Sequence, residues 1–190
     1  MNKTFIYLVF LALLLYYLFF TDSGKKTVEY FTLDTKSVYW DVFQRMYPEI
    51  LDTINGNGLS IEESQALAVV LKESYNDCLS KNNSSVIGDD GHSIGFMQVS
   101  LPALTDVNSQ YGFNYKISDL YNEKINILVG CCYLNLCYLS ATRQTSDRAI
   151  WLAFKKYNGG IGQSLTSTNV MASAYADKAF EYYQKFKEYV

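Results

Sequence analysis

The sequence has few of the residues on which several common classes of protein depend. It contains one histidine, two prolines and four cysteines in 190 residues. A single histidine excludes a catalytic scheme or a metal site that needs two, and two prolines exclude a proline-rich linker protein. The formal net charge is −3, which argues against nucleic acid as a partner, because phosphate binding needs a basic face.

Aromatic residues, by contrast, are abundant in this chain. Its 17 tyrosines and 11 phenylalanines exclude a disordered protein, which would be poor in aromatic residues. A chain of 190 residues suits one domain, or one domain with an appendage. A domain of this size buries about two thirds of its unfolded surface, so it needs neither a metal nor a disulfide to be stable.

The first 22 residues differ in composition from the rest of the chain. Residues 5–20 contain no charge and would cover about 24 Å as a helix. No small-residue cleavage motif follows them, so we expect residues 1–22 to form an uncleaved transmembrane signal anchor. A cleaved signal peptide and a buried core helix are the alternatives. Lys3 precedes the run and Lys25 and Lys26 follow it, so the lysines leave the membrane orientation open.

Residues 23–32 are polar and lack periodicity, and we interpret them as a linker to a domain over residues 33–190. Apolar residues in this domain recur mostly at helical spacing, which predicts a mainly α fold. A Ser60–Glu63 capping box should open one helix, and Pro48 should kink or interrupt the helix before it. The predicted helices cover residues 38–54, 60–73, a segment beginning near 101–102, 125–139, 147–156 and 170–189. Residues 78–95 are rich in Ser, Asn, Asp and Gly, which predicts an irregular loop or a small β-hairpin.

Glu73 is the candidate for acid–base chemistry. It lies near the end of an apolar helix beside the loop, where we expect it to be half-buried, and desolvation raises the pKa of a carboxyl group. A carboxylic acid that is protonated at neutral pH can donate its proton to a glycosidic oxygen. A lone glutamate near a helix end is more often an ordinary solvated side chain, so Glu73 needs support from other segments.

Four segments provide that support, and together they resemble one known family. In chain order they are Glu73-Ser74, Gly95-Phe96-Met97-Gln98, the helix with Asn126-Ile127, Gly130 and Tyr133-Leu134, and Tyr157-Asn158-Gly159-Gly160. They resemble the Glu-Ser, Gly-Leu-Met-Gln, Asn-Ile-x-x-Gly-x-x-Tyr-Leu and Tyr-Asn-x-Gly segments of SLT-type lytic transglycosylases. The chain is also similar to goose-type lysozymes, which share the lysozyme-like α fold. The resemblance covers about residues 60–180, and Tyr175 lies where the family often has a last active-site tyrosine.

The resemblance implies a substrate and a reaction. The substrate would be the peptidoglycan glycan strand, cut at the β-1,4 bond between N-acetylmuramic acid and N-acetylglucosamine. Glu73 would protonate the leaving oxygen and then act as the base while the muramyl C6 hydroxyl attacks C1 of the same sugar. The product would carry a 1,6-anhydro ring. This route needs one carboxylate and neither a metal nor another cofactor.

The resemblance also implies a set of substrate-binding residues. Gly95 would let the backbone approach a sugar closely, while Met97 and Gln98 would line a groove. Tyr157 would hydrogen-bond Glu73 or stack near the reacting sugar, unless it is one more core aromatic, and Gly130 would let two helices pack closely. The complete set of candidate substrate-binding residues is Ser74, Asp89, Ser93, Gly95, Phe96, Met97, Gln98, Tyr157, Asn158 and Tyr175.

Hydrolysis is the alternative outcome of the same cleavage. An inverting glycosidase needs a second carboxylate about 6.5–9.5 Å from the first. Asp89 and Asp90 are candidates because Gly88-Asp89-Asp90-Gly91 resembles the Gly-Asp-Arg-Gly of goose-type lysozymes, although a solvated turn is an equally simple role for them. The position of that family's second aspartate is Ser100 here, which weakens the hydrolase interpretation.

The remaining polar and sulfur-containing residues carry no predicted chemistry. His92 is interpreted as a loop residue, because it lacks the partners of a triad or a metal site. Cys131, Cys132 and Cys137 lie on an apolar helix as small core residues, and export would allow a disulfide from Cys78 to Cys131 or Cys132.

The sequence therefore predicts a membrane-anchored, peptidoglycan-cleaving enzyme with a lysozyme-like α domain. Its catalytic domain would face the cell wall, either in a bacterial envelope or from the membrane of a phage virion, where it would act as a lysin. Its predicted partners are peptidoglycan and the membrane, with no nucleic acid, and the sequence names no protein partner. The alternative from another class is a non-catalytic peptidoglycan-binding membrane protein that kept the fold.

Overall fold

The structure is a computed structural model that describes residues 37–75, 77–88 and 91–190. The chain divides into two units, residues 1–40 and 41–190, and the described part of the first unit is residues 37–40. The predicted transmembrane anchor over residues 1–22 and the linker over residues 23–32 lie outside the described residues and stay predictions.

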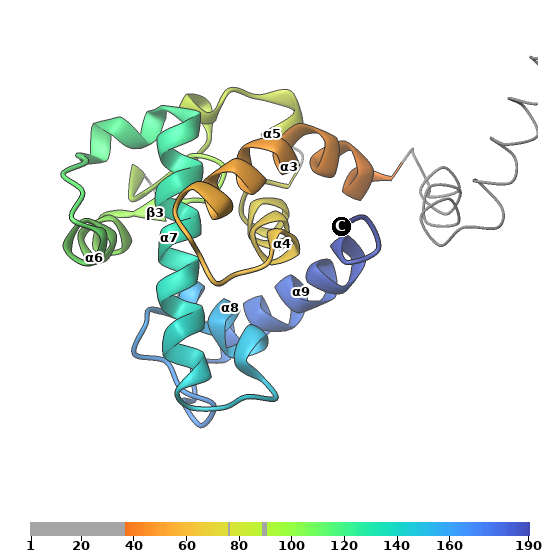
Figure 1. Ribbon diagram of the computed structural model, residues 1–190, viewed down its shortest axis with the longest axis vertical. Helices are drawn as coiled ribbons and strands as arrows, with labels where there is room; N and C mark the ends of the chain where they lie inside the picture. Colours follow the sequence, from red (N-terminus) through yellow and green to blue (C-terminus); the bar gives the residue numbers. More distant parts are fainter. Residues whose placement is uncertain (1–36, 76, 89–90) are drawn as a thin grey trace, which may run out of the picture. The chain divides into compact units, whose positions relative to one another are not determined.

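Helices dominate the described part of the chain, so the mainly α fold class is confirmed (Figure 1). The helices are α3 (Val38–Gly56), α4 (Glu63–Ser74), α5 (Asp77–Ser80), α6 (Leu101–Tyr111), α7 (Glu123–Thr142), α8 (Ala149–Gly159) and α9 (Val170–Phe186), with short 3-10 helices η1 (Asn83–Ser85) and η3 (Ile117–Tyr121). The predicted helices over residues 125–139, 147–156 and 170–189 correspond to α7, α8 and α9.

The core forms around α7, which packs against α8, while α8 also packs against α9 and α9 against α4 (Figure 1). Among the described helices, α7 alone is long and apolar enough to cross a membrane by length and composition. However, 61% of its most apolar stretch is buried inside the domain. A helix with neighbours on most sides carries apolar residues on most faces, and α7 has this pattern of a core helix.

One local prediction about a helix boundary is wrong. The first residue of α4 is Glu63, its N-cap is Glu62, and the Glu62 N–H donates to Gln65 Oε1 at 2.7 Å, so the cap lies two residues after the predicted Ser60. The Ser60 N–H instead donates to the side chain of Asn135 on α7 at 2.8 Å. Pro48 does not interrupt α3: the helix is continuous from Val38 to Gly56, and Pro48 lies on its exposed side.

The predicted loop region, residues 78–95, contains a small hairpin as the sequence indicated, and a third strand beyond this region extends the hairpin into an antiparallel sheet. Its strands are β1 (Ile87–Gly88), β2 (Ser93–Ile94) and β3 (Val99–Ser100), in the order β1-β2-β3. Ile87 pairs with Ile94, and Ser93 pairs with Ser100. Ser100 is also the N-cap of α6, whose first turn contains Pro102, so the sheet passes directly into this helix.

All four cysteines are buried free thiols, so the disulfide that export would allow is not formed in this structure. Burial raises the pKa of the thiols on α7, that of Cys132 to about 12. A buried thiol with a raised pKa is a poor nucleophile. The cysteines therefore act as small core residues, as predicted.

Candidate active site

Glu73 lies at the end of a buried helix, half-exposed and next to a strained turn. The preceding residues of α4 from Ala66 to Val70 are fully buried, which fixes the helix against the core. Tyr75, two residues after Glu73, has a φ of +42°, a conformation that is costly for a residue with a side chain. The chain thus leaves α4 abruptly just after the carboxylate, and Glu73 stays at the helix end.

Two buried tyrosine hydroxyls flank Glu73, one from α8 and one from α9. Burial raises the pKa of Tyr157 and of Tyr175 well above 10, and the negative charge of Glu73 is the second cause in both cases. Both phenols therefore lie close to the carboxylate and are neutral at physiological pH. The structure brings together three residues that the sequence proposed separately: Glu73, Tyr157 and Tyr175.

The two hydroxyls differ in their hydrogen bonds. The Tyr157 hydroxyl donates to the carbonyl of Met97 at 2.7 Å, so its hydrogen bond goes to the β2–β3 loop and not to Glu73 as one of the predictions had it. The Tyr175 hydroxyl is buried and has no aligned hydrogen-bond partner among the described residues. Glu73 nevertheless raises the pKa of Tyr175 both as a charge and as a hydrogen-bonding group, so the two groups are neighbours without a well-aligned bond.

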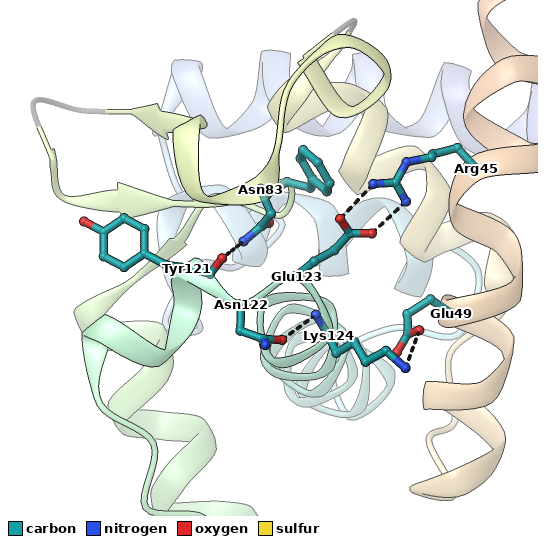
Figure 2. Close-up of polar contacts among 8 residues, drawn as sticks. Arg45, Glu49, Asn83, Tyr121, Asn122, Glu123 and Lys124 are labelled. Carbon is teal, nitrogen blue, oxygen red and sulfur yellow. Dashed lines mark hydrogen bonds and ion pairs between the residues drawn. The ribbon is translucent and has the colours of Figure 1, made fainter.

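Two buried asparagines lock the backbone of the Gly95–Gln98 loop in place. The side chain of Asn83 accepts from the Phe96 N–H at 2.8 Å and donates to the Leu120 carbonyl at 2.8 Å. It also donates to the Tyr121 carbonyl (Figure 2). The side chain of Asn126 on α7 accepts from the Met97 N–H at 3.0 Å and donates to the Ile94 carbonyl at 2.7 Å. Each asparagine uses both the oxygen and the nitrogen of its side-chain amide. Because both side chains are buried, water does not compete for these hydrogen bonds.

Gly95 is required by this lock and not by a close approach to sugar. Its φ is +79°, and a Cβ there would lie 2.3 Å from Asn126 Nδ2 and 2.5 Å from Asn83 Oδ1. The space that a side chain would need is filled from inside the domain. The prediction that Gly95 opens the backbone to a sugar is corrected accordingly.

Phe96 and Met97 are core residues, so the prediction that the Met97 side chain lines a groove is wrong, and the Phe96 side chain is not exposed to a substrate either. Both side chains are fully buried. Met97 packs onto Gly130 of α7, where a Cβ would lie 2.4 Å from the Met97 sulfur. Gly130 therefore admits a loop side chain and not a second helix, contrary to the prediction. Met97 contacts the candidate active site through its backbone carbonyl, which accepts a hydrogen bond from the Tyr157 hydroxyl.

The other candidate residues differ in how far they are exposed. Ser74 is buried and donates its hydroxyl to the carbonyl of Val70 at 2.8 Å, and Ser93 is buried within the sheet. Gln98 is partly exposed, has a φ of +45° and donates to the Gly95 carbonyl at 2.7 Å, so it braces its own loop. Asn158 is exposed to solvent. The predicted second carboxylates, Asp89 and Asp90, lie outside the described residues.

An ion pair that the sequence did not predict, Arg45–Glu123, lies next to the Gly95–Gln98 loop. Arg45 on α3 binds both carboxylate oxygens of Glu123, each at 2.7 Å, and its guanidinium lies 5.6 Å from the centre of the Phe96 ring (Figure 2). The hydrogen bonds to Glu123 raise the pKa of Arg45. Arg45 and Asn83 carry no local sequence signal, because each acts on a residue more than ten positions away.

The site chemistry rests on a carboxylate and neutral phenols. Across the described ranges, no three His, Cys, Asp or Glu side chains come together in a group able to hold a metal ion. A half-buried carboxylate beside neutral hydroxyls can give and take a proton at a bound substrate.

Comparisons with known proteins identify a family and a similar fold. The sequence matches the family described as Transglycosylase SLT domain over residues 54–180. Among solved structures, the fold is similar to that of lytic transglycosylase Slt from Pseudomonas aeruginosa, determined by X-ray as an inactive mutant in which a glutamate is replaced by glutamine. The TM-score is 0.56 at 18% identity, over 75% of this chain and 24% of that one, so this chain spans about a quarter of Slt. No curated protein matches the sequence. Because the family match covers most of the chain, the protein belongs to the SLT transglycosylase family that its motifs predicted.

Proposed function

We propose that this protein is a lytic transglycosylase that cuts the β-1,4 bond between N-acetylmuramic acid and N-acetylglucosamine, with Glu73 as the general acid and then the base. The observation that carries the proposal is the position of Glu73. It ends a buried helix of an SLT domain, half-exposed, with the buried hydroxyls of Tyr157 and Tyr175 beside it. The inactive Slt mutant, in which glutamine replaces a glutamate, is consistent with a glutamate as the working group of this fold.

The proposed reaction uses one carboxyl group twice. Protonated Glu73 donates its proton to the glycosidic oxygen, and the bond from that oxygen to C1 of the muramyl sugar breaks. Ionised Glu73 then takes the proton from the C6 hydroxyl of the same sugar as the C6 oxygen bonds to C1. The products are a new sugar hydroxyl and a 1,6-anhydro ring, and Glu73 is protonated again for the next cycle.

The two tyrosines support this cycle without adding charge. Their raised pKa values keep both phenols neutral at physiological pH, so neither competes with Glu73 for a proton. Tyr157 holds the Gly95–Gln98 loop through Met97, which fixes the loop to the helix α8. The Tyr175 hydroxyl has no aligned partner among the described residues and is available to donate to Glu73 when that group is ionised.

Two alternatives to this reaction, both raised by the sequence, are hydrolysis and a non-catalytic role. Hydrolysis would need Asp89 or Asp90 to position water, and a non-catalytic wall-binding protein would need neither step. We also propose that residues 1–22 anchor the protein in a membrane with the catalytic domain facing the cell wall, in a bacterial envelope or a phage virion. These proposals rest on the apolar run at residues 5–20 and on the location of the substrate.

Mass spectrometry of the fragments released from purified peptidoglycan tests the reaction directly. Fragments ending in anhydromuramic acid, lighter by one water than reducing-end fragments, would support the transglycosylase route. Reducing-end fragments would show that water attacks and would direct attention to Asp89 and Asp90. No release from any type of peptidoglycan, by protein shown to be folded, would leave the binding-protein alternative.

A further inference from the structure

A cavity separate from Glu73 lies between α6, the C-terminal half of α7 and the first residue after the Tyr157–Gly160 motif. Its volume is about 430 Å³, which is within the range of sites for small ligands. Its apolar wall includes Leu136, Leu139 and Ile161, and its polar wall includes Asp106, Gln110 and Arg143. The cavity therefore combines apolar surface with one negative and one positive group.

The two charged groups of this cavity make no ion pair or side-chain hydrogen bond with the described residues, although the charge of Asp106 acts on Tyr133 and Cys137. Arg143 is exposed and Asp106 is half-exposed. Among the ion pairs and side-chain hydrogen bonds of the described residues, none involves either side chain. Opposite charges that share a cavity without pairing with each other or with a neighbour are available to a ligand that carries both signs.

A second cavity, on the outer side of α8 and α9, makes an instructive contrast. It has a similar volume, about 440 Å³, and it too contains an arginine and an aspartate, Arg148 and Asp177. There the Trp151 indole contacts both charged groups. Its N–H donates to Asp177 at 2.8 Å, and the Arg148 guanidinium lies 4.4 Å from the centre of its ring. A side chain of the protein thus contacts both charged groups of the second cavity. Of these two cavities, the first is the one whose arginine and aspartate lack such a contact among the described residues.

The first cavity is coupled to the candidate active site through one buried tyrosine. Burial raises the pKa of Tyr133, and the nearby Cys137 and Asp106 raise it further, while the backbone of Ile161 lowers it in part. Two residues of the cavity wall, Asp106 and Ile161, therefore lie close to Tyr133. The Tyr133 ring centre is 5.4 Å from that of Tyr157, whose hydroxyl lies near Glu73. In addition, buried Lys156 donates to the Ile161 carbonyl at 2.6 Å and to the Gln163 carbonyl, which fixes this wall to the helix that carries Tyr157.

We propose that this cavity binds the stem peptide of the peptidoglycan strand while Glu73 acts on the glycan. The proposal rests on the proposed function, because it takes peptidoglycan as the substrate. An uncrosslinked stem peptide has short apolar side chains, free carboxylates and the ammonium group of a diamino acid. Arg143 pairs with a carboxylate, Asp106 pairs with the ammonium, and the leucine side chains contact the methyl groups.

Titration calorimetry of the full-length protein with synthetic stem tetrapeptide tests this pairing. Arg143→Ala should weaken binding about fivefold, the upper range for an exposed ion pair. That loss should vanish when the peptide carries a terminal amide in place of its carboxylate. Asp106→Asn should weaken binding of the free-amine peptide and leave binding of the side-chain-acetylated peptide unchanged. Arg148→Ala, which changes the arginine of the second cavity, is the matched control and should bind like the wild type.

Three results would overturn the proposal: no binding of the tetrapeptide, an equal loss for charged and capped peptides, or an equal loss in Arg148→Ala. Cleavage assays separate this proposal from the proposed function. With intact strands, Arg143→Ala should raise KM about fivefold and leave kcat unchanged, whereas strands stripped of peptide should show no difference. Tetrapeptide binding through Arg143 without any cleavage would contradict the proposed function alone. Normal cleavage with no effect of Arg143→Ala on either assay would contradict the stem-peptide site alone.

Discussion

The helices α4, α8 and α9 form one side of the candidate active site. On this side the polar groups of the motif residues lie close to one another. Glu73 lies near the hydroxyls of Tyr157 and Tyr175, and its charge acts on both. On the opposite side, the β2–β3 loop turns its motif side chains inward. Phe96 and Met97 are fully buried, and the loop meets α8 through a backbone carbonyl.

This difference shows that residues of one sequence motif set serve two physical purposes. The first side needs particular functional groups, a carboxylate and hydroxyls. The second side needs a particular backbone path, which Gly95, Asn83 and Asn126 enforce by shape and hydrogen bonding. Substitutions on the first side should therefore affect the reaction, and substitutions on the second should affect folding first.

The largest expected effect is that of Glu73→Gln. Glutamine keeps the size of the side chain but cannot shuttle a proton, so we expect the rate of fragment release to fall about 10³-fold or more. Thermal unfolding and sedimentation with peptidoglycan should remain close to those of the wild type. Glu63→Gln, the same change at the other end of α4, is the control and should keep full activity. Undiminished lysis by Glu73→Gln would refute the role of this residue.

Next in size is the loss of stability in Gly95→Ala. The positive φ costs a side chain about 1–2 kcal/mol, and the new Cβ would clash with Asn126 and Asn83, so urea unfolding should show a loss of about 3 kcal/mol or more. Gly112→Ala isolates the first contribution, because Gly112 has a φ of +71° and open space around it. If the two variants lose equal stability, the packing argument for Gly95 is wrong.

A smaller effect should distinguish the two tyrosines. Tyr157→Phe leaves the buried Met97 carbonyl without its donor, which should cost about 1–3 kcal/mol in the free energy of unfolding. Tyr175→Phe removes a hydroxyl with no aligned partner, so its stability should equal or exceed that of the wild type, while its rate of cleavage falls about tenfold. Equal stabilities of the two variants, measured by urea unfolding, would contradict the contrast between the hydroxyls.

The smallest effect is a difference in pH dependence above pH 10. Burial, and then the charge of Glu73, raises the pKa of Tyr157 and Tyr175 in the folded state above the usual value of 10. The stabilisation from each neutral phenol is complete below pH 10 and is lost as the pH rises, because the unfolded chain ionises first, by about 1.4 kcal/mol per pH unit. Urea unfolding between pH 9 and 11 should therefore give Tyr157→Phe a shallower decline than the wild type. Parallel declines would show that this phenol ionises equally in both states.

The sequence was sufficient for much of this description. Helical periodicity predicted the helices that became α7, α8 and α9, and the Ser- and Asn-rich stretch predicted the hairpin of the small sheet. The four motif segments identified the family, and Glu73 was found near the end of its helix as expected. These features depend on neighbours a few residues apart, or on the order of segments along the chain, and both are visible in one dimension.

The roles of individual motif residues required the tertiary structure. Met97 is joined to Tyr157, sixty positions later, and to Asn126, and Asn83 reaches Phe96, Leu120 and Tyr121. Such contacts decide which side chains face the site and which fill the core, and local pattern does not record them. The sequence by itself determined the helices, the family and the acidic residue. Only the packing of distant segments decided that Tyr157 and Tyr175 stand beside Glu73, while Gly95, Phe96 and Met97 serve the fold, because burial is a property of the folded chain and not of its local order.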